Sequence, residues 1–435
     1  MAKRVWCGAL LALVALTAFP AAGAGAQEAP PTTAGAGAAI QGVMQSGSTP
    51  IEGVRVLVTG VDDPSFEADA TSDQEGHWII PVPGRGVYRV AIDPSTIPEE
   101  FELANPDRIE LPNFRVFADR PQNVVFAFKS DEGGIAVPSR WERLLNLFVS
   151  GVRLGLIIGV CSVGLSLVFG TTGLVNFAHG ELVTFGALVA FYFNTSSSGP
   201  QWSLVIATLL AMVGGALLGS ALELGLWRPM VRRRSGVMAR MLVSIGLALA
   251  LRYTYEFIFG AGPRAFREFS AQGPLDFGPL TMPARDYWIM AISVCVLVGV
   301  GMILQLSRLG TAVRAVADER DLAAASGIDV KRVILYVWAG GTALAALGGV
   351  MLAVSQSVQY NLGFRLLLTM FAAVVLGGLG SAYGAMVGGL AVGIAQEVST
   401  YWISPDYKFA VALVILILVL LVRPQGILGV RERVG

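Results

Sequence analysis

Residues Leu147–Phe169 read LFVSGVRLGLIIGVCSVGLSLVF, an apolar run of 23 residues in which Arg153 is the one charged side chain. An α-helix needs roughly 20 apolar residues to cross a bilayer, so this run predicts a membrane span. Further apolar stretches follow at Leu174–Phe193, Leu204–Leu226, Met238–Phe259, Tyr287–Leu306, Val333–Ser355, Leu366–Leu376 (continuing towards Ser381), Tyr383–Ser399 and Phe409–Val422. Residues 141–430 are therefore predicted to form a polytopic α-helical membrane domain of about nine spans.

The composition of the whole chain agrees with a membrane protein. Of the 435 residues, 54% are hydrophobic and 14% are charged, against roughly 25% charged in a typical soluble domain. This hydrophobic content excludes an intrinsically disordered chain. The 31 basic and 31 acidic residues leave no basic excess, which excludes an electrostatically driven nucleic-acid binder.

The charges are unevenly distributed, and their distribution predicts an orientation. Residues 27–140 carry a net charge of −9, whereas residues 141–435 carry +7. If residues 27–140 are exported, alternating spans place thirteen loop cations inside and seven outside, which fits the positive-inside rule. The mature N-terminus is therefore expected outside and the C-terminus inside.

The first 26 residues predict a signal peptide. Lys3 and Arg4 precede the apolar run Val5–Phe19, and the small residues Ala24–Ala26 form a cleavage site. The alternative is an uncleaved anchor helix, for which the apolar run is short. Residues 27–39 are rich in Pro, Thr, Ala and Gly and are predicted to be a linker.

Residues 40–130 predict an all-β sandwich that precedes the membrane domain and lies outside the cytoplasm. Segments typical of half-buried strands occur at Val54–Val58, His77–Ile80, Gly86–Ile92 and Asn123–Phe128, with turn residues between them. The segment resembles the carboxypeptidase-regulatory-like (transthyretin-like) domain at Gly42, Pro50–Val54, Thr71–Gly76, Pro83-Gly84 and Tyr88. This resemblance implies an accessory rather than a catalytic role.

The sequence lacks the patterns that support enzymatic chemistry. None of the four lysines follows a glycine, so the chain has no Gly-Lys-Ser/Thr phosphate loop for ATP. The two histidines, His77 and His179, fall in different predicted compartments, which excludes a metal site built on a histidine pair. We therefore expect no catalytic residues, no metal site and no cofactor.

One polar segment, Gly170–Glu181, interrupts the apolar sequence in the first half of the membrane domain. Polar groups at the start of a span are costly unless they face protein or water. An ordinary interfacial loop is one interpretation. The other is a broken helix that lines a solute pathway, with Asn176, His179, Gly180 and Glu181 as candidate pathway residues.

A glycine-rich segment, Val374–Gly384, interrupts the second half. Its glycines at spacings of four are explained by close helix packing alone. However, paired interruptions in two halves of a transporter point to a solute site at their interface. Gly377, Gly378, Gly380 and Ser381 are therefore further candidate pathway residues.

The predicted inner loop, residues 307–332, has a helix-compatible pattern that ends at Gly327. It is either a solvated positive loop or a short amphipathic helix that docks on a partner. The second interpretation is favoured because alanine and valine are unusually frequent in it. The candidate coupling residues are Arg314, Ala315, Val316, Ala317, Asp318 and Gly327.

Together these segments resemble the permease subunits of branched-chain amino-acid ABC importers. The resemblance is carried by Asn176–Glu181, Arg314–Asp318 with Gly327-Ile328, Leu376–Ser381 and Arg423–Gly429. It implies inward transport of branched-chain or related amino acids across the bacterial cytoplasmic membrane. It also implies as partners ABC ATPase subunits that use the ATP, a second permease subunit and an extracytoplasmic solute-binding protein.

Alternative functions remain open from the residues. A urea or short-chain amide ABC permease shares the motifs, and a transporter or channel driven by an ion gradient belongs to a different class. Two arginines within predicted spans also need partners. We expect Arg252 to pair with Glu256 four residues on, and Arg153 to reach the outer interface.

Overall fold

A computed structural model describes residues 39–427, apart from 47–48, 62, 64, 85, 99, 102, 104–108, 117–121, 129–139, 197–198, 267–273, 278–279 and 424. The predicted signal peptide lies outside the described residues, as does the predicted linker up to residue 38. The chain forms two compact units, one within Gly25–Ser139 and the other containing Arg140–Gly435. Each unit is described by itself below.

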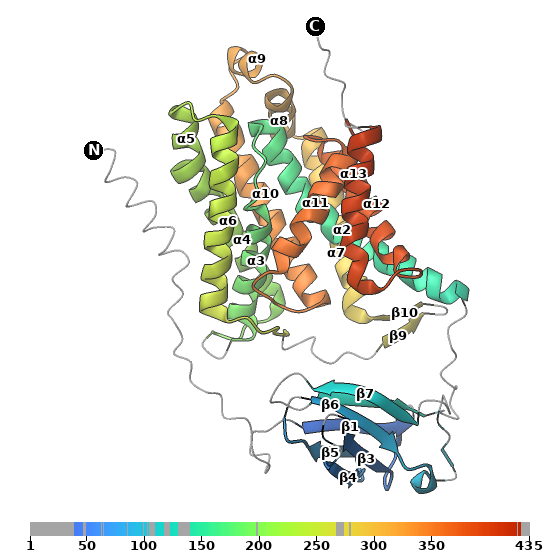
Figure 1. The fold of residues 1–435 in the computed structure, drawn as a ribbon. Helices are drawn as coiled ribbons and strands as arrows, with labels where there is room; N and C mark the ends of the chain where they lie inside the picture. Colours follow the sequence, from blue (N-terminus) through green and yellow to red (C-terminus); the bar gives the residue numbers. More distant parts are fainter. Residues whose placement is uncertain are drawn as a thin grey trace. The chain divides into compact units, whose positions relative to one another are not determined.

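The first unit is built from strands. They are β1 (Ala39–Ser46), β2 (Thr49–Pro50), β3 (Arg55–Gly60), β4 (Glu67–Thr71), β5 (His77–Pro81), β6 (Gly86–Ile92), β7 (Glu110–Val116) and β8 (Gln122–Ala127). One sheet has the order β2-β1-β5, with β8 parallel to β1, and the other has the order β4-β3-β6-β7. Figure 1 shows the two sheets as the blue and cyan arrows.

Alternation along the strands places apolar side chains from both sheets in one core. Val56 and Val58 of β3 are fully buried, and Trp78 and Ile80 of β5 belong to the same cluster. The four predicted strand segments correspond to β3, β5, β6 and β8. Gly42 of β1 is needed for close packing, because a Cβ there would lie 2.4 Å from the carbonyl oxygen of Val124.

The second unit is a bundle of helices. They are α2 (Arg140–Thr172), α3 (His179–Asn194), α4 (Leu204–Leu222), α5 (Arg228–Arg232), α6 (Val237–Phe259), α7 (Ala284–Leu306), α8 (Arg308–Asp318), α9 (Arg320–Ala325), α10 (Val330–Ser355), α11 (Leu362–Gly377), α12 (Ala382–Ser399) and α13 (Lys408–Val422). A π-helical turn joins α4 to α5, and the strands β9 (Pro274–Phe277) and β10 (Leu280–Pro283) precede α7.

Five segments in the described part are long and apolar enough to cross a membrane: α2, the α4–α5 segment, α6, α7 and α10. Each coincides with a predicted span. The α11–α12 pair, bent by 120° at its break, adds a sixth if it counts as one span. Helices α3 and α13 have 16 and 15 residues. The structure thus supports a polytopic helical membrane protein, and nine spans stays a prediction.

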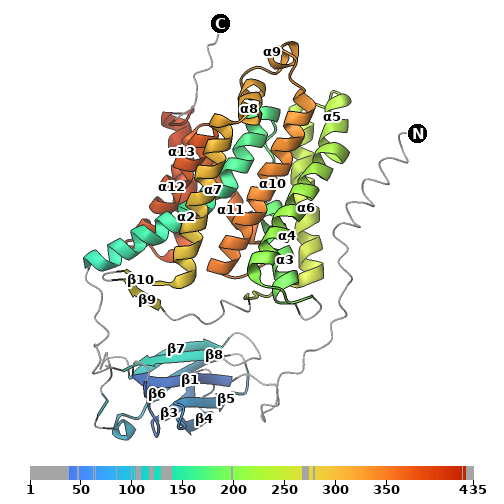
Figure 2. The same ribbon diagram turned by 180° about the vertical axis from the view of Figure 1, so that it is seen from behind.

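The helices have a buried centre and an apolar outer surface. In α2 and α10, 78% of the most apolar window is buried, against 17% in α6 and 22% in α7. Exposed side chains on α6 and α7 include Leu242, Phe257 and Val298. Helices that are apolar on their exposed face suit contact with lipid. Figures 1 and 2 both place α5, α8 and α9 at one end of the bundle and β9–β10 at the other.

Glycines bring the central helices into backbone contact. A Cβ on Gly164 of α2 would lie 2.3 Å from the carbonyl oxygen of Gly341 on α10, and one on Gly393 of α12 would lie 2.3 Å from Cα of Gly155 on α2. Small residues at helix interfaces allow this approach in membrane proteins. The packing holds α2 between α10 and α12, and so fixes the positions of the two polar interruptions.

Candidate functional site

The break between α2 and α3 carries the first group of candidate residues. Gly173 adopts φ +61°, a conformation that ends α2. Asn176, His179 and Glu181 are almost completely buried, and each retains a buried polar atom without a hydrogen-bond partner in the described structure. Because an unpaired buried polar atom costs about 1–3 kcal/mol, such atoms call for a functional explanation. These unpaired atoms are the observation that favours a broken helix facing a solute.

The other hydrogen bonds of these side chains orient them. Asn176 accepts from the backbone N–H of Ala178 at 3.1 Å, and Nε2 of His179 lies 3.1 Å from the carbonyl oxygen of Cys161 on α2. Nδ1 of His179 is left unpaired. The imidazole therefore bridges α2 and the first turn of α3.

Gly180 serves packing in the described structure. A Cβ at Gly180 would lie 2.6 Å from the carbonyl oxygen of Gly363, and one at Gly363 would lie 1.8 Å from that of Gly180. The backbone N–H of Gly363 also donates to Oγ1 of Thr184 at 3.0 Å. The start of α3 is thus fixed against the start of α11.

The second break lies between α11 and α12. Gly378 and Gly380 adopt φ values of +109° and +82°, and Ser381 caps α12 by accepting from the backbone N–H of Gly384 at 3.0 Å. A Cβ on Gly377 would lie 1.9 Å from the carbonyl oxygen of Gly384. This close approach allows the 120° bend.

The end of α2, where the first break begins, meets the second break. A Cβ on Gly170, three residues before Gly173, would lie 3.0 Å from the carbonyl oxygen of Gly380. The segment after α13 also docks here, because the backbone N–H of Ile427 donates to the carbonyl oxygen of Leu376 at 2.7 Å. The end of α2 and the glycine-rich break between α11 and α12, distant in sequence, therefore form one junction.

The predicted coupling loop forms α8 and α9. Arg314, Asp318 and Gly327 are exposed, Ala315 and Ala317 are half-buried, and Val316 is buried against the bundle. Gly327 adopts φ +85°, and the N–H groups of Gly327 and Ile328 donate to the carbonyl oxygens of Ala324 and Ala323. These bonds form the Schellman stop of α9, which confirms the helix end predicted at Gly327.

A contact that the sequence does not reveal joins this loop to the first break. Nε of Arg320 on α9 donates to the carbonyl oxygen of Thr171 at 2.9 Å, and a second guanidinium nitrogen donates to the same oxygen. That carbonyl belongs to the last turn of α2, where helix carbonyls lack intrahelical partners. Partial burial, followed by repulsion from Arg240, lowers the pKa of Arg320 below its usual range.

The two arginines within spans have partners other than those expected. Arg252 forms no ion pair with Glu256 in the described structure; its guanidinium lies over the ring of Phe364, 4.4 Å from the centroid. Arg153 pairs with Asp286 in the first turn of α7, a partner that the sequence around Arg153 does not indicate. A cation–π contact and a long-range ion pair each stabilise a charged side chain within a helical bundle.

A cavity of about 370 Å³ lies beside the C-terminal ends of α10 and α12 and the N-terminal ends of α11 and α13. Its lining residues come from α2, α10, α11, α12, α13 and the connection between α10 and α11: Ser150, Arg153, Leu154, Ile157, Leu352, Ser355, Gln356, Gln359, Leu362, Arg365, Leu366, Gln396, Glu397, Lys408 and Phe409. None of the eight predicted pathway residues lines this cavity. Its volume is at the lower end of the range for small-molecule sites.

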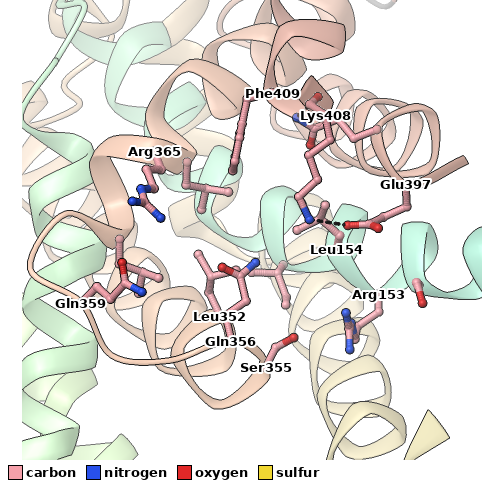
Figure 3. Close-up of a pocket in the computed structure, with 15 residues that line it drawn as sticks. Arg153, Leu154, Leu352, Ser355, Gln356, Gln359, Arg365, Glu397, Lys408 and Phe409 are labelled. Carbon is pink, nitrogen blue, oxygen red and sulfur yellow. Dashed lines mark hydrogen bonds and ion pairs between the residues drawn. The ribbon is translucent and has the colours of Figure 1, made fainter. Parts of the chain in front are cut away.

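The polar groups of the cavity fall into two clusters (Figure 3). Arg365 and Gln359 lie on one side, and Arg153 lies on the other with the Lys408–Glu397 ion pair, whose Nζ and Oε1 atoms are 3.1 Å apart. The lining also includes five aliphatic side chains: Leu154, Ile157, Leu352, Leu362 and Leu366. The cavity therefore offers both charged and apolar surface.

Comparison with known proteins identifies the helical unit. The family described as "Branched-chain amino acid transport system / permease component" matches residues 147–420. The "High-affinity branched-chain amino acid transport system permease protein LivH" of Salmonella typhimurium is 32% identical over 295 residues, covering 66% of this chain and 95% of that protein. The corresponding BraD protein of Pseudomonas aeruginosa is 30% identical over 296 residues, with the same coverage. The solved structure of PsaBC from Streptococcus pneumoniae in complex with Fab gives a TM-score of 0.40 at 15% identity, covering 65% of this chain and 92% of that chain.

Proposed function

The chain belongs to the family of permease components of branched-chain amino acid transport systems; on this premise we propose that it is the membrane permease subunit of an ABC importer for branched-chain or related amino acids. The observation that carries the proposal is the family match over residues 147–420, which includes both breaks and the α8–α9 loop. ATP hydrolysis is assigned to partner ATPase subunits. A second permease subunit and a solute-binding protein complete the proposed transporter.

The proposed topology has nine spans in the bacterial cytoplasmic membrane, with the C-terminus inside. It is supported by the distribution of loop cations and by the end of the bundle that α5, α8 and α9 share. The β-rich unit, after removal of the signal peptide, then lies outside the cytoplasm. We assign it the recruitment of the solute-binding protein.

The α8–α9 loop is the proposed contact with the ATPase subunits. Arg314 and Asp318 face away from the bundle, whereas Val316 fixes α8 to it. Movement of the loop reaches the junction of the two breaks through the bond from Arg320 to Thr171. The proposed pathway residues are Gly377, Gly378, Gly380 and Ser381 at that junction and, just before and along the start of α3, Asn176, His179, Gly180 and Glu181; Gly180 and Gly377 also allow close packing.

The test is uptake of radiolabelled leucine by cells that carry the complete transport system. Arg314→Glu reverses an exposed charge on α8, and we expect it to reduce uptake at least tenfold while the protein remains in the membrane. Arg232→Glu, an exposed cation at the same end of the bundle, is the matched control and is expected to retain uptake. Normal uptake by Arg314→Glu would contradict the docking role of the loop.

The same assay separates the alternative functions. Competition by leucine, isoleucine and valine supports the amino-acid importer, and competition by urea alone supports the amide permease. Uptake that persists without ATP but collapses with the ion gradient supports a secondary transporter or channel.

A further inference from the structure

We propose that the cavity between α2 and α10–α13 is a solute-binding site in which Arg365 holds a carboxylate and the aliphatic wall holds an apolar side chain. This inference rests on the proposed transport function and deepens it, since it assigns the residues that hold the carboxylate and the apolar side chain of the solute. It assigns a site at residues that the sequence motifs do not include.

The charge balance of the cavity singles out Arg365. Arg153 pairs with Asp286, which also lies 3.9 Å from Arg285, and Lys408 pairs with Glu397. Arg365 has no acidic partner in the described part of the chain, so one cation in the lining remains uncompensated. A planar guanidinium recognises a carboxylate through two parallel hydrogen bonds, and this makes an anionic group the natural partner.

The position of Arg365 suits a solute that enters from water. The side chain is exposed and lies at the edge of the cavity, beside Gln359 (Figure 3). An exposed cation at the mouth of a low-dielectric cavity attracts anionic groups from solution. The first contact of an incoming carboxylate is therefore with Arg365.

The rest of the lining suits the apolar side chain and the ammonium group of the solute. Leu154, Ile157 and Leu352 are almost completely buried and present aliphatic surface to the cavity. Ser355 and Gln356 provide neutral oxygens that accept hydrogen bonds from an ammonium group. A carboxylate, an ammonium and an aliphatic side chain are together an apolar amino acid, whereas urea has neither the charge nor the apolar group.

The inference is tested by binding of radiolabelled leucine to the full chain in lipid nanodiscs, with three competitors. These are 4-methylpentanoate, which keeps the carboxylate, 3-methylbutylamine, which keeps the amine, and urea. We expect displacement by leucine and 4-methylpentanoate and none by the amine or urea. Displacement by the amine as effective as that by the acid would overturn the inference.

Variants of the cavity give an independent measurement. Arg365→Gln is expected to weaken leucine binding roughly tenfold or more, because a charge-assisted bidentate contact is lost. Arg365→Lys keeps the charge, and its affinity for leucine is expected to lie between those of the wild type and Arg365→Gln. Arg264→Gln removes a cation that does not line the cavity, from a residue whose backbone pairs with that of Val358, and is expected to bind as the wild type. Unchanged binding in Arg365→Gln would overturn the inference.

Two further results keep the test decisive. If Arg365→Gln fails to fold, the comparison of acid and amine on the wild-type chain decides alone. Leucine uptake by cells carrying the complete system is measured in parallel. If leucine is taken up but its binding does not depend on the carboxylate, only the cavity assignment is contradicted. If ATP-dependent uptake is absent, the proposed function is contradicted, and the binding result alone then decides the cavity assignment.

Discussion

The contact between Arg320 and Thr171 leads to a quantitative prediction. Arg320→Met keeps an unbranched apolar side chain but removes both donors to the Thr171 carbonyl. Thr171 is 1% exposed, so this carbonyl is left without its partner in a buried position. An orphaned buried acceptor costs about 1–3 kcal/mol, and loss of a cation at a helix C-terminus adds about 0.3–1 kcal/mol.

Because Arg320 is only half-buried, the expected loss of local stability is near the lower part of this range, about 2 kcal/mol. At about 1.4 kcal/mol per factor of ten, this corresponds to a roughly thirtyfold increase in opening of the last turn of α2. Opening of this turn exposes the backbone N–H of Gly173, which is bonded to the carbonyl oxygen of Phe169 at 2.7 Å.

Hydrogen exchange of peptides that cover residues 165–180 measures this opening directly. We expect roughly thirtyfold faster exchange in Arg320→Met, together with ATP hydrolysis that is less tightly linked to leucine uptake. Arg314→Met, on the exposed face of α8, is the control and should change exchange little. If Arg320→Met exchanges as slowly as the control, the proposed link between loop and break is wrong.

Two other predictions concern the junction and the orientation. Gly380→Ala places a side chain at φ +82° opposite Gly170 and should lower both thermal stability and leucine uptake. The control is Gly246→Ala, whose added Cβ meets open space and should change neither. Equal behaviour of the two variants would contradict a tight junction. Ser65→Cys, in a chain whose three native cysteines are replaced, should react with a membrane-impermeant maleimide in intact spheroplasts; labelling only after lysis would reverse the proposed orientation.

Local sequence patterns predicted the elements because the signals are local. Each of the five long apolar helices coincides with a hydropathy peak, and β3, β5 and β6 follow the alternation in their segments. Gly327 was predictable as a helix stop because only a residue tolerant of positive φ serves there. Propensity and hydropathy require no knowledge of distant neighbours.

Local sequence patterns did not predict the contacts between residues that are distant in sequence. Arg153 pairs with Asp286, 133 positions away, and Arg252 stacks on Phe364 rather than pairing with Glu256 on its own helix. A helical spacing of four shows that two side chains can meet, but the ring that Arg252 contacts lies on another helix, α11, whose position the sequence of α6 does not give. The cavity was missed for the same reason, since its lining runs from Ser150 to Phe409.

The geometry of α2 and α11 connects the cavity with the junction. On α2, Ile157 lines the cavity and Gly170 lies at the junction, thirteen residues apart, which is about 20 Å at 1.5 Å per residue. On α11, Leu362 and Arg365 line the cavity and Gly377 enters the bend. Close-packed helices move as stiff elements, so a displacement at one end is carried to the other. Because Arg320 holds the α2 end of this pair, we expect a shift of the α8–α9 loop to change the shape of the cavity.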